Sequence, residues 1–83
     1  DLNLSPFDII RRRVAAFLDR ERRATQMDIA DLQDRYGART SAELAAKIER
    51  GEVYSHPAWE ELIEWQNLEA YLDRLGRWQA SVD

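Results

Sequence analysis

The chain has 83 residues, of which 12 are Lys or Arg and 16 are Asp or Glu, and its formal net charge is −4 at pH 7. This length fits one domain with a small core, and the lack of Cys excludes disulfides and thiolate metal sites. No apolar run approaches the length needed to cross a bilayer, and the absence of Cys fits a cytoplasmic protein.

A long amphipathic helix is predicted over residues 6–36. Ser5 is a favourable N-cap and Pro6 suits the first helical position. Apolar residues then recur every three or four positions until Gly37, which suits the end of a helix. An unbroken helix of about 30 residues would be about 45 Å long, more than a globule of this size covers. The polar residues 19–26 leave two possibilities open: the helix breaks near them, or it projects and pairs with another chain.

Two further helices are predicted, a short one over residues 41–50 and a long one over residues 57–75. Gly51 suits the end of the first, Pro57 suits the start of the second, and Gly76 suits its end. No alternating strand pattern occurs. We therefore expect a single all-α domain over residues 1–83, with three helices in a long–short–long antiparallel arrangement. We also expect it to be dimeric through the first helix.

The Arg-rich segments have two interpretations. Residues 11–13 are all Arg, and residues 20–23 contain three more, which suits contact with phosphates. Acidic residues lie among them, and Asp8–Arg12 and Asp19–Arg23 have the spacing of helical ion pairs. The C-terminal half is acidic, whereas nucleic-acid binding needs cations. A solvated, salt-paired face is the favoured interpretation, and nucleic acid is not an expected partner.

An acidic cluster on the third predicted helix is the best candidate for an enzyme site. The string Glu60-Glu61-Leu-Ile-Glu64 resembles the first acidic motif of the all-α nucleotide pyrophosphohydrolases, in which carboxylates of neighbouring helices hold Mg²⁺. That family carries its second acidic pair on a separate helix. Here Glu69 and Asp73 follow on the same helix, and one helix cannot surround a metal ion. We therefore expect no enzyme activity, no metal and no cofactor.

All three Trp residues lie in the last 25 residues of the chain. Trp and Tyr are favoured anchors of protein interfaces. They also fill small cores, and the sequence leaves both possibilities open for Trp59 and Trp65. The third helix carries apolar residues over more than one face, which favours a second surface that buries it.

Residues 36–75 resemble small antitoxin subunits of bacterial and archaeal toxin–antitoxin pairs. The resemblance is carried by Tyr36-Gly37, Glu43-Leu44, Pro57-Ala58-Trp59-Glu60-Glu61 and Glu64-Trp65. It implies a protein that covers the site of a toxin with helices and acidic side chains. The partner-binding residues that we expect are Trp59, Glu60, Glu61, Glu64, Trp65 and Tyr71.

Three functions follow in order of preference. The first is an antitoxin-like protein-interaction subunit that binds and inhibits a partner toxin in the cytoplasm. The second is a stand-alone helical homodimer with a structural or regulatory role. The third is a Mg²⁺-dependent enzyme that resembles the nucleotide pyrophosphohydrolases.

Overall fold

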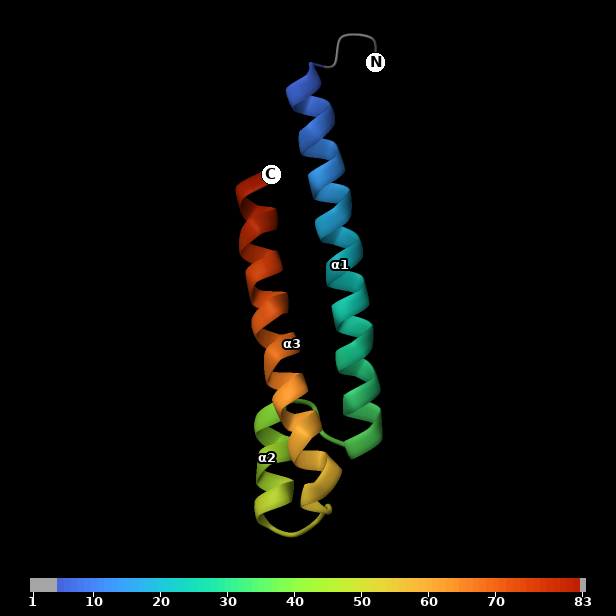
Figure 1. Cartoon of the computed structure of the whole chain (residues 1–83), viewed down its shortest axis with the longest axis vertical. Coiled ribbons are helices and arrows are strands. Elements are labelled where there is room, and N and C mark those ends of the chain that lie inside the picture. The colour runs from blue at the N-terminus through green and yellow to red at the C-terminus, as the bar shows by residue number, and fades with distance from the viewer. Residues whose placement is uncertain (1–4, 83) are drawn as a thin grey trace.

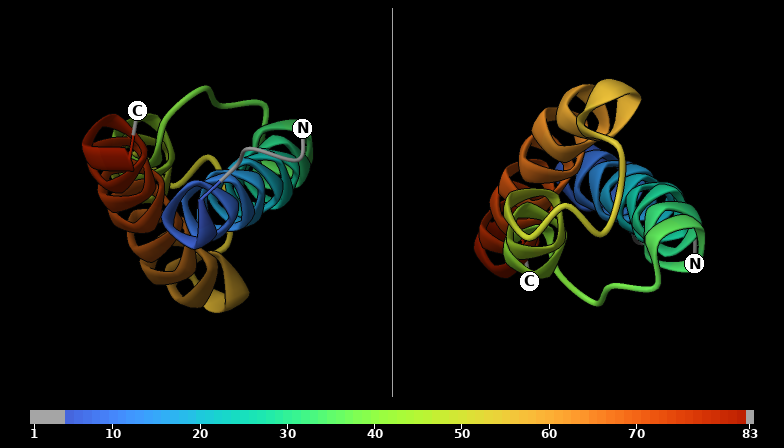
Figure 2. Two further views of the ribbon diagram at one scale, coloured as in Figure 1. Left: turned by 90° about the horizontal axis from the view of Figure 1, so that it is seen from above. Right: turned by 90° about the horizontal axis from the view of Figure 1, so that it is seen from below.

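The structure is a computed structural model that describes residues 5–82, and it consists of three helices joined by short loops (Figure 1). Helix α1 is Pro6–Tyr36, α2 is Ser41–Glu49 and α3 is Ser55–Val82. Helices α1 and α3 run antiparallel, and α2 lies beside the N-terminal part of α3 (Figure 2). The described residues contain no strand, so the expected all-helical class is confirmed.

The molecule is elongated, with extents of 61 × 18 × 16 Å and a radius of gyration of 17.5 Å. A compact domain of this length would have a radius of gyration of about 12 Å. At one end, α2 packs on α3 and the three helices share one core, and we call this the three-helix end. At the other, only α1 and α3 lie together, and α1 projects beyond the last turn of α3 (Figure 1). We call this the two-helix end.

Helix α1 is continuous through its polar segment, so the break near residues 19–26, one of the two possibilities that the sequence left open, does not occur. The Ser5 side chain accepts a hydrogen bond from the Asp8 N–H at 3.1 Å and starts the helix. Gly37 ends it in the left-handed conformation, with φ at 61°. Within the polar segment Thr25 is buried, and its hydroxyl donates to the Glu21 carbonyl at 2.7 Å. The segment stays helical because α3 packs along it. The helix therefore projects, as the second possibility required, whereas its pairing with another chain stays a prediction.

Helix α3 is longer than expected, because Gly76 does not end it and the helix continues to Val82. The reason is tertiary packing. Leu75 is fully buried, and Gln79 accepts a hydrogen bond from the Arg22 guanidinium at 2.6 Å. A helical Gly costs about 1 kcal/mol relative to Ala, which these contacts offset.

The other helix boundaries agree with the sequence to within a residue or two. His56 has a non-helical backbone (φ −121°, ψ 121°), so regular helix starts at Pro57 as predicted. Proline disfavours the helical conformation in the residue before it, which accounts for this kink. Helix α2 ends at Glu49, one residue before the predicted end.

The core lies at the three-helix end. It is built from Leu32 of α1, Ala38 of the following loop, Leu44 of α2, and Leu62 and Trp65 of α3. Trp65 and Leu44 are fully buried. For Trp65, the question left open by the sequence is therefore answered: it is a core residue.

Candidate functional site

The six residues expected to bind a partner fall into two groups in the structure. One group, on the outside of α3, is exposed and consists of Trp59, Glu60 and Glu64. The other group faces the rest of the molecule and consists of Glu61, Trp65 and Tyr71. Only the first group leaves side chains free for a partner.

The exposed group forms a compact surface with one further residue. Trp59 and Ile63 lie one turn apart on α3 and are 56% and 48% exposed. Glu60 and Glu64 lie alongside them, also one turn apart. Within residues 5–82, neither of these carboxylates takes part in an ion pair or a side-chain hydrogen bond. We call these four residues the acidic face. Ile63 was not among the expected site residues, although its spacing from Trp59 could have identified it.

Glu61 ties α3 to the end of α1. Its carboxylate accepts hydrogen bonds from the Arg35 guanidinium and the Tyr36 hydroxyl. Burial, and then this hydrogen bond to the carboxylate, raise the pKa of Tyr36 to about 12. Glu61 therefore has a structural role in the isolated chain, and a partner would have to displace these contacts to reach it.

Two more polar contacts hold the helices together. The Tyr71 hydroxyl donates to Glu21 of α1 at 2.7 Å, and this hydrogen bond, together with burial, raises the pKa of Tyr71. Glu69 accepts from the hydroxyl of Ser41 at 2.6 Å and from its N–H at 3.1 Å, which fixes the start of α2 on α3. Tyr71 thus acts within the fold rather than on the acidic face.

The carboxylates of α3 do not converge on a common point. Glu61 and Glu69 bind groups of α1 and α2 respectively, whereas Glu60 and Glu64 point away from the core. Among residues 5–82, no group of three or more His, Asp or Glu side chains is arranged to hold a metal ion. Across the same residues, no helix is long and apolar enough to cross a membrane.

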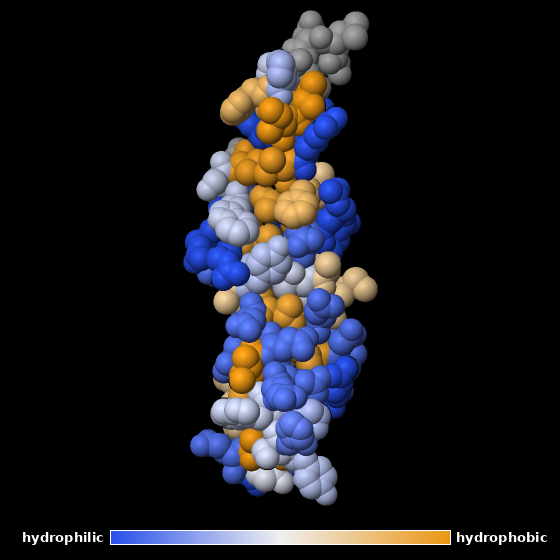
Figure 3. Space-filling model, in the orientation of Figure 1, coloured by the Kyte–Doolittle hydropathy of each residue, from blue (hydrophilic) through white to orange (hydrophobic). Residues whose placement is uncertain are grey.

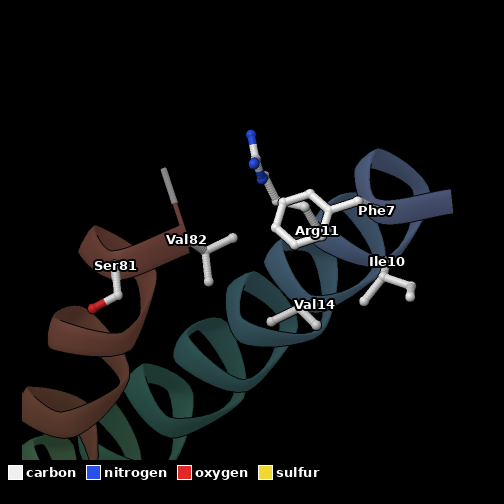
Figure 4. Close-up of a pocket in the computed structure, with 6 residues that line it drawn as sticks. All are labelled: Phe7, Ile10, Arg11, Val14, Ser81 and Val82. Atoms are coloured by element: carbon white, nitrogen blue, oxygen red, sulfur yellow. The ribbon is translucent and has the colours of Figure 1, made fainter. Parts of the chain in front are cut away.

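A second surface, at the two-helix end, was not anticipated. Phe7, Ile10, Val14 and Phe17 form a stripe on α1 that is largely exposed, at 65% for Phe7 and 61% for Ile10. Together with Trp78 and Val82 of α3, we call this stripe the apolar end. In Figure 3 most of the orange, hydrophobic surface lies toward this end of the molecule. A hollow of about 370 Å³ lies between the two helices there (Figure 4).

This surface was not predicted because all apolar residues of α1 were treated as a single stripe. The residues of α1 that are buried in the structure are Leu18, Thr25 and Leu32, at intervals of seven. At 3.6 residues per turn, Phe7 and Val14 lie within about 20° of that seam, whereas Ile10 and Phe17 lie roughly 60–80° around the helix from it. The phase of Ile10 and Phe17 could have been read from the sequence, whereas the exposure of Phe7 and Val14 depends on where α3 ends, at Val82.

Charge is distributed unevenly along the molecule. Residues 27–69, which make up most of the three-helix end, contain ten acidic and four basic residues, a net charge of −6. Residues 5–26, at the other end of α1, contain three acidic and six basic residues, a net charge of +3. The expected Asp19–Arg23 ion pair is present at 3.1 Å, whereas Asp8 instead caps the helix through Ser5. The acidic face and the apolar end thus lie in regions of opposite charge.

Comparison with known proteins places the chain in a family but gives no activity. Searches among curated proteins and among solved structures gave no match. A family model, that of the Uncharacterized protein MJ0235 family, matches residues 2–78, nearly the whole chain. The chain therefore belongs to the Uncharacterized protein MJ0235 family.

Proposed function

We propose that this chain is a protein-interaction subunit that binds a partner protein through the acidic face, in the manner of an antitoxin bound to its toxin. The observation that carries the proposal is the exposure of Trp59 and Ile63 beside two carboxylates that are unpaired within residues 5–82. Large apolar side chains at the centre of an interface supply most of its affinity. Charges beside them accelerate association and select the partner.

The chemistry of the acidic face indicates what the partner presents. A surface that receives Trp59 and Ile63 must be apolar, and one that lies against Glu60 and Glu64 must be basic. Toxins that act on nucleic acid have basic sites, and the resemblance of residues 36–75 to antitoxin subunits includes Trp59, Glu60 and Glu64. The proposal locates the pair in the cytoplasm, where both proteins are made.

Co-expression with the product of the adjacent reading frame tests this proposal. Only the present chain carries a tag, and the amount of co-purified partner is measured for the wild type and for Trp59→Ala. The matched control is Trp78→Ala, because Trp78 is also about half exposed (49%) but lies at the two-helix end. The proposal expects a stoichiometric partner that Trp59→Ala reduces at least tenfold and Trp78→Ala does not. Absence of a partner, or equal loss in both variants, contradicts it.

A second candidate, self-association through α1, is favoured by a different observation. The apolar end exposes four large side chains of α1. Large contiguous apolar patches are rare on monomeric proteins, and they usually mark a site of interaction. This candidate predicts that the purified chain exceeds the 9.7 kDa of one copy. Light scattering after gel filtration measures this, and a monomer at every concentration contradicts it.

A further inference from the structure

The apolar stripe of α1 extends beyond the surface that α3 covers. Phe7 and Val14 lie within about 20° of the residues that pack on α3, whereas Ile10 and Phe17 lie roughly 60–80° around the helix from them. Figure 4 shows Val14 directed into the hollow, with Val82 of α3 on the opposite wall. The apolar face of α1 is therefore wider than the part that α3 covers, and a second helix fits beside it at the two-helix end, as in a bundle.

The residues beside this stripe are basic. Helical geometry puts Arg11 on one side of it and Arg13 and Arg20 on the other. The Arg11 guanidinium lies over the Phe7 ring, 4.9 Å from its centre. No ion pair within residues 5–82 uses any of these three guanidinium groups. The stripe therefore fits an apolar surface that carries carboxylates beside it.

Charge disfavours a symmetric contact between two copies of the stripe. In an antiparallel pair that sets Phe7 against Phe17 of a second copy, Arg11 faces Arg11 and Arg13 faces Arg13. Like charges in these positions destabilise a helix pair. High salt would strengthen such a dimer by screening the repulsion.

The acidic face has the complementary pattern. Trp59 and Ile63 are one turn apart, like Ile10 and Val14 of the stripe. Glu60 and Glu64 line the side of this face, and carboxylates beside arginines stabilise a helix pair. The two surfaces lie toward opposite ends of a molecule 61 Å long, so one copy does not bring its own surfaces together.

We infer that the apolar end of one copy docks, head to tail, on the acidic face of a second copy. The contact joins two different surfaces, so copies add one after another instead of stopping at two. The same face binds the partner in the function proposed above, so self-association would compete with partner binding. That last consequence rests on the proposed function, whereas the contact itself does not.

Sedimentation velocity over a range of concentrations tests the contact with the chain alone. For the wild type, the mean mass rises with concentration, and the association weakens at least about fivefold between about 0.05 and 0.5 M NaCl. Two charge-reversed variants, Arg11→Glu/Arg13→Glu and Glu60→Arg/Glu64→Arg, are each monomeric. Mixing them restores association, because each variant supplies one intact surface.

A matched control is Arg12→Glu, which reverses a charge on the opposite side of the same helix and leaves association unchanged. A wild type that is monomeric up to millimolar concentration overturns the proposal. So does a dimer that stops at two and tightens with salt, since this is the symmetric contact. Equal association of Arg11→Glu/Arg13→Glu and the wild type also overturns it. None of these results involves the partner protein, so they are independent of the co-purification test.

Discussion

Two tryptophans of α3, six residues apart, are expected to differ sharply in their contribution to stability. Trp65 is fully buried in the core, whereas Trp59 is 56% exposed on the acidic face. Replacing a fully buried Trp by Ala costs about 3–5 kcal/mol. Scaling that cost by the buried fraction of Trp59 gives about 1–2 kcal/mol. A domain of this length has a free energy of unfolding of about 4–12 kcal/mol, so Trp65→Ala removes a large part of it.

Urea unfolding followed by far-UV circular dichroism measures both losses. We expect Trp65→Ala to lower the free energy of unfolding by at least about 2 kcal/mol more than Trp59→Ala does. The dependence of that free energy on urea concentration (the m value) should be similar in both variants. Trp65→Phe is a second variant in case Trp65→Ala does not fold. It leaves a small cavity but removes an indole N–H that has no hydrogen-bond partner among the described residues. These effects oppose each other, so Trp65→Phe should stay within about 1 kcal/mol of the wild type. Equal losses for Trp65→Ala and Trp59→Ala would refute the assignment of core and surface.

Three further predictions concern the contacts that hold the helices in place. Because the pKa of Tyr36 is raised to about 12 in the folded state, its neutral hydroxyl contributes fully to the free energy of unfolding below about pH 10, and this contribution is lost as the pH rises from about 10 to 12. The urea midpoint of the wild type should therefore fall over this pH range, and it should fall less for Tyr36→Phe. An equal fall in both proteins would contradict the assignment. Gly37 has φ at 61° and Gly76 is helical, so Gly37→Ala should destabilise by about 1 kcal/mol and Gly76→Ala should stabilise by up to about 1 kcal/mol. Thermal melts with effects of the same sign would count against this. A double-mutant cycle between Ser41→Ala and Glu69→Gln should show a coupling of about 1 kcal/mol, and additive losses would mean that the contact contributes nothing.

Local signals predicted the helix starts and one helix end well. Ser5 and Pro6 start α1, and Gly37 ends it, because each satisfies or terminates backbone hydrogen bonding without help from distant residues. Gly76 was wrongly predicted to end α3, because the free-energy cost of a helical Gly is smaller than the stabilisation gained by packing α3 on α1. Leu75 is buried in the core, and Gln79 contacts Arg22, 57 positions earlier in the chain. Neither contact can be read from the sequence alone.

The candidate site was predicted in part, and for a similar reason. Trp59, Glu60 and Glu64 lie together on the surface, as their spacing on a helix requires. Glu61 and Trp65 share that helix but face α1 and the core, because helical periodicity turns them away from Trp59. Which side of α3 faces inward depends on how the other helices pack, so composition alone did not separate these two sets.

A growth assay shows whether a partner protein binds the acidic face. The product of the adjacent reading frame is induced in cells that also express this chain, either wild type or with Trp59→Ala and Glu64→Gln together. Circular dichroism first checks that both forms fold. We expect that they do, because both substitutions are on the surface. We expect that the product alone arrests growth, that the wild-type chain restores growth and that the double variant does not. A product without toxicity, or full rescue by the double variant, would contradict it.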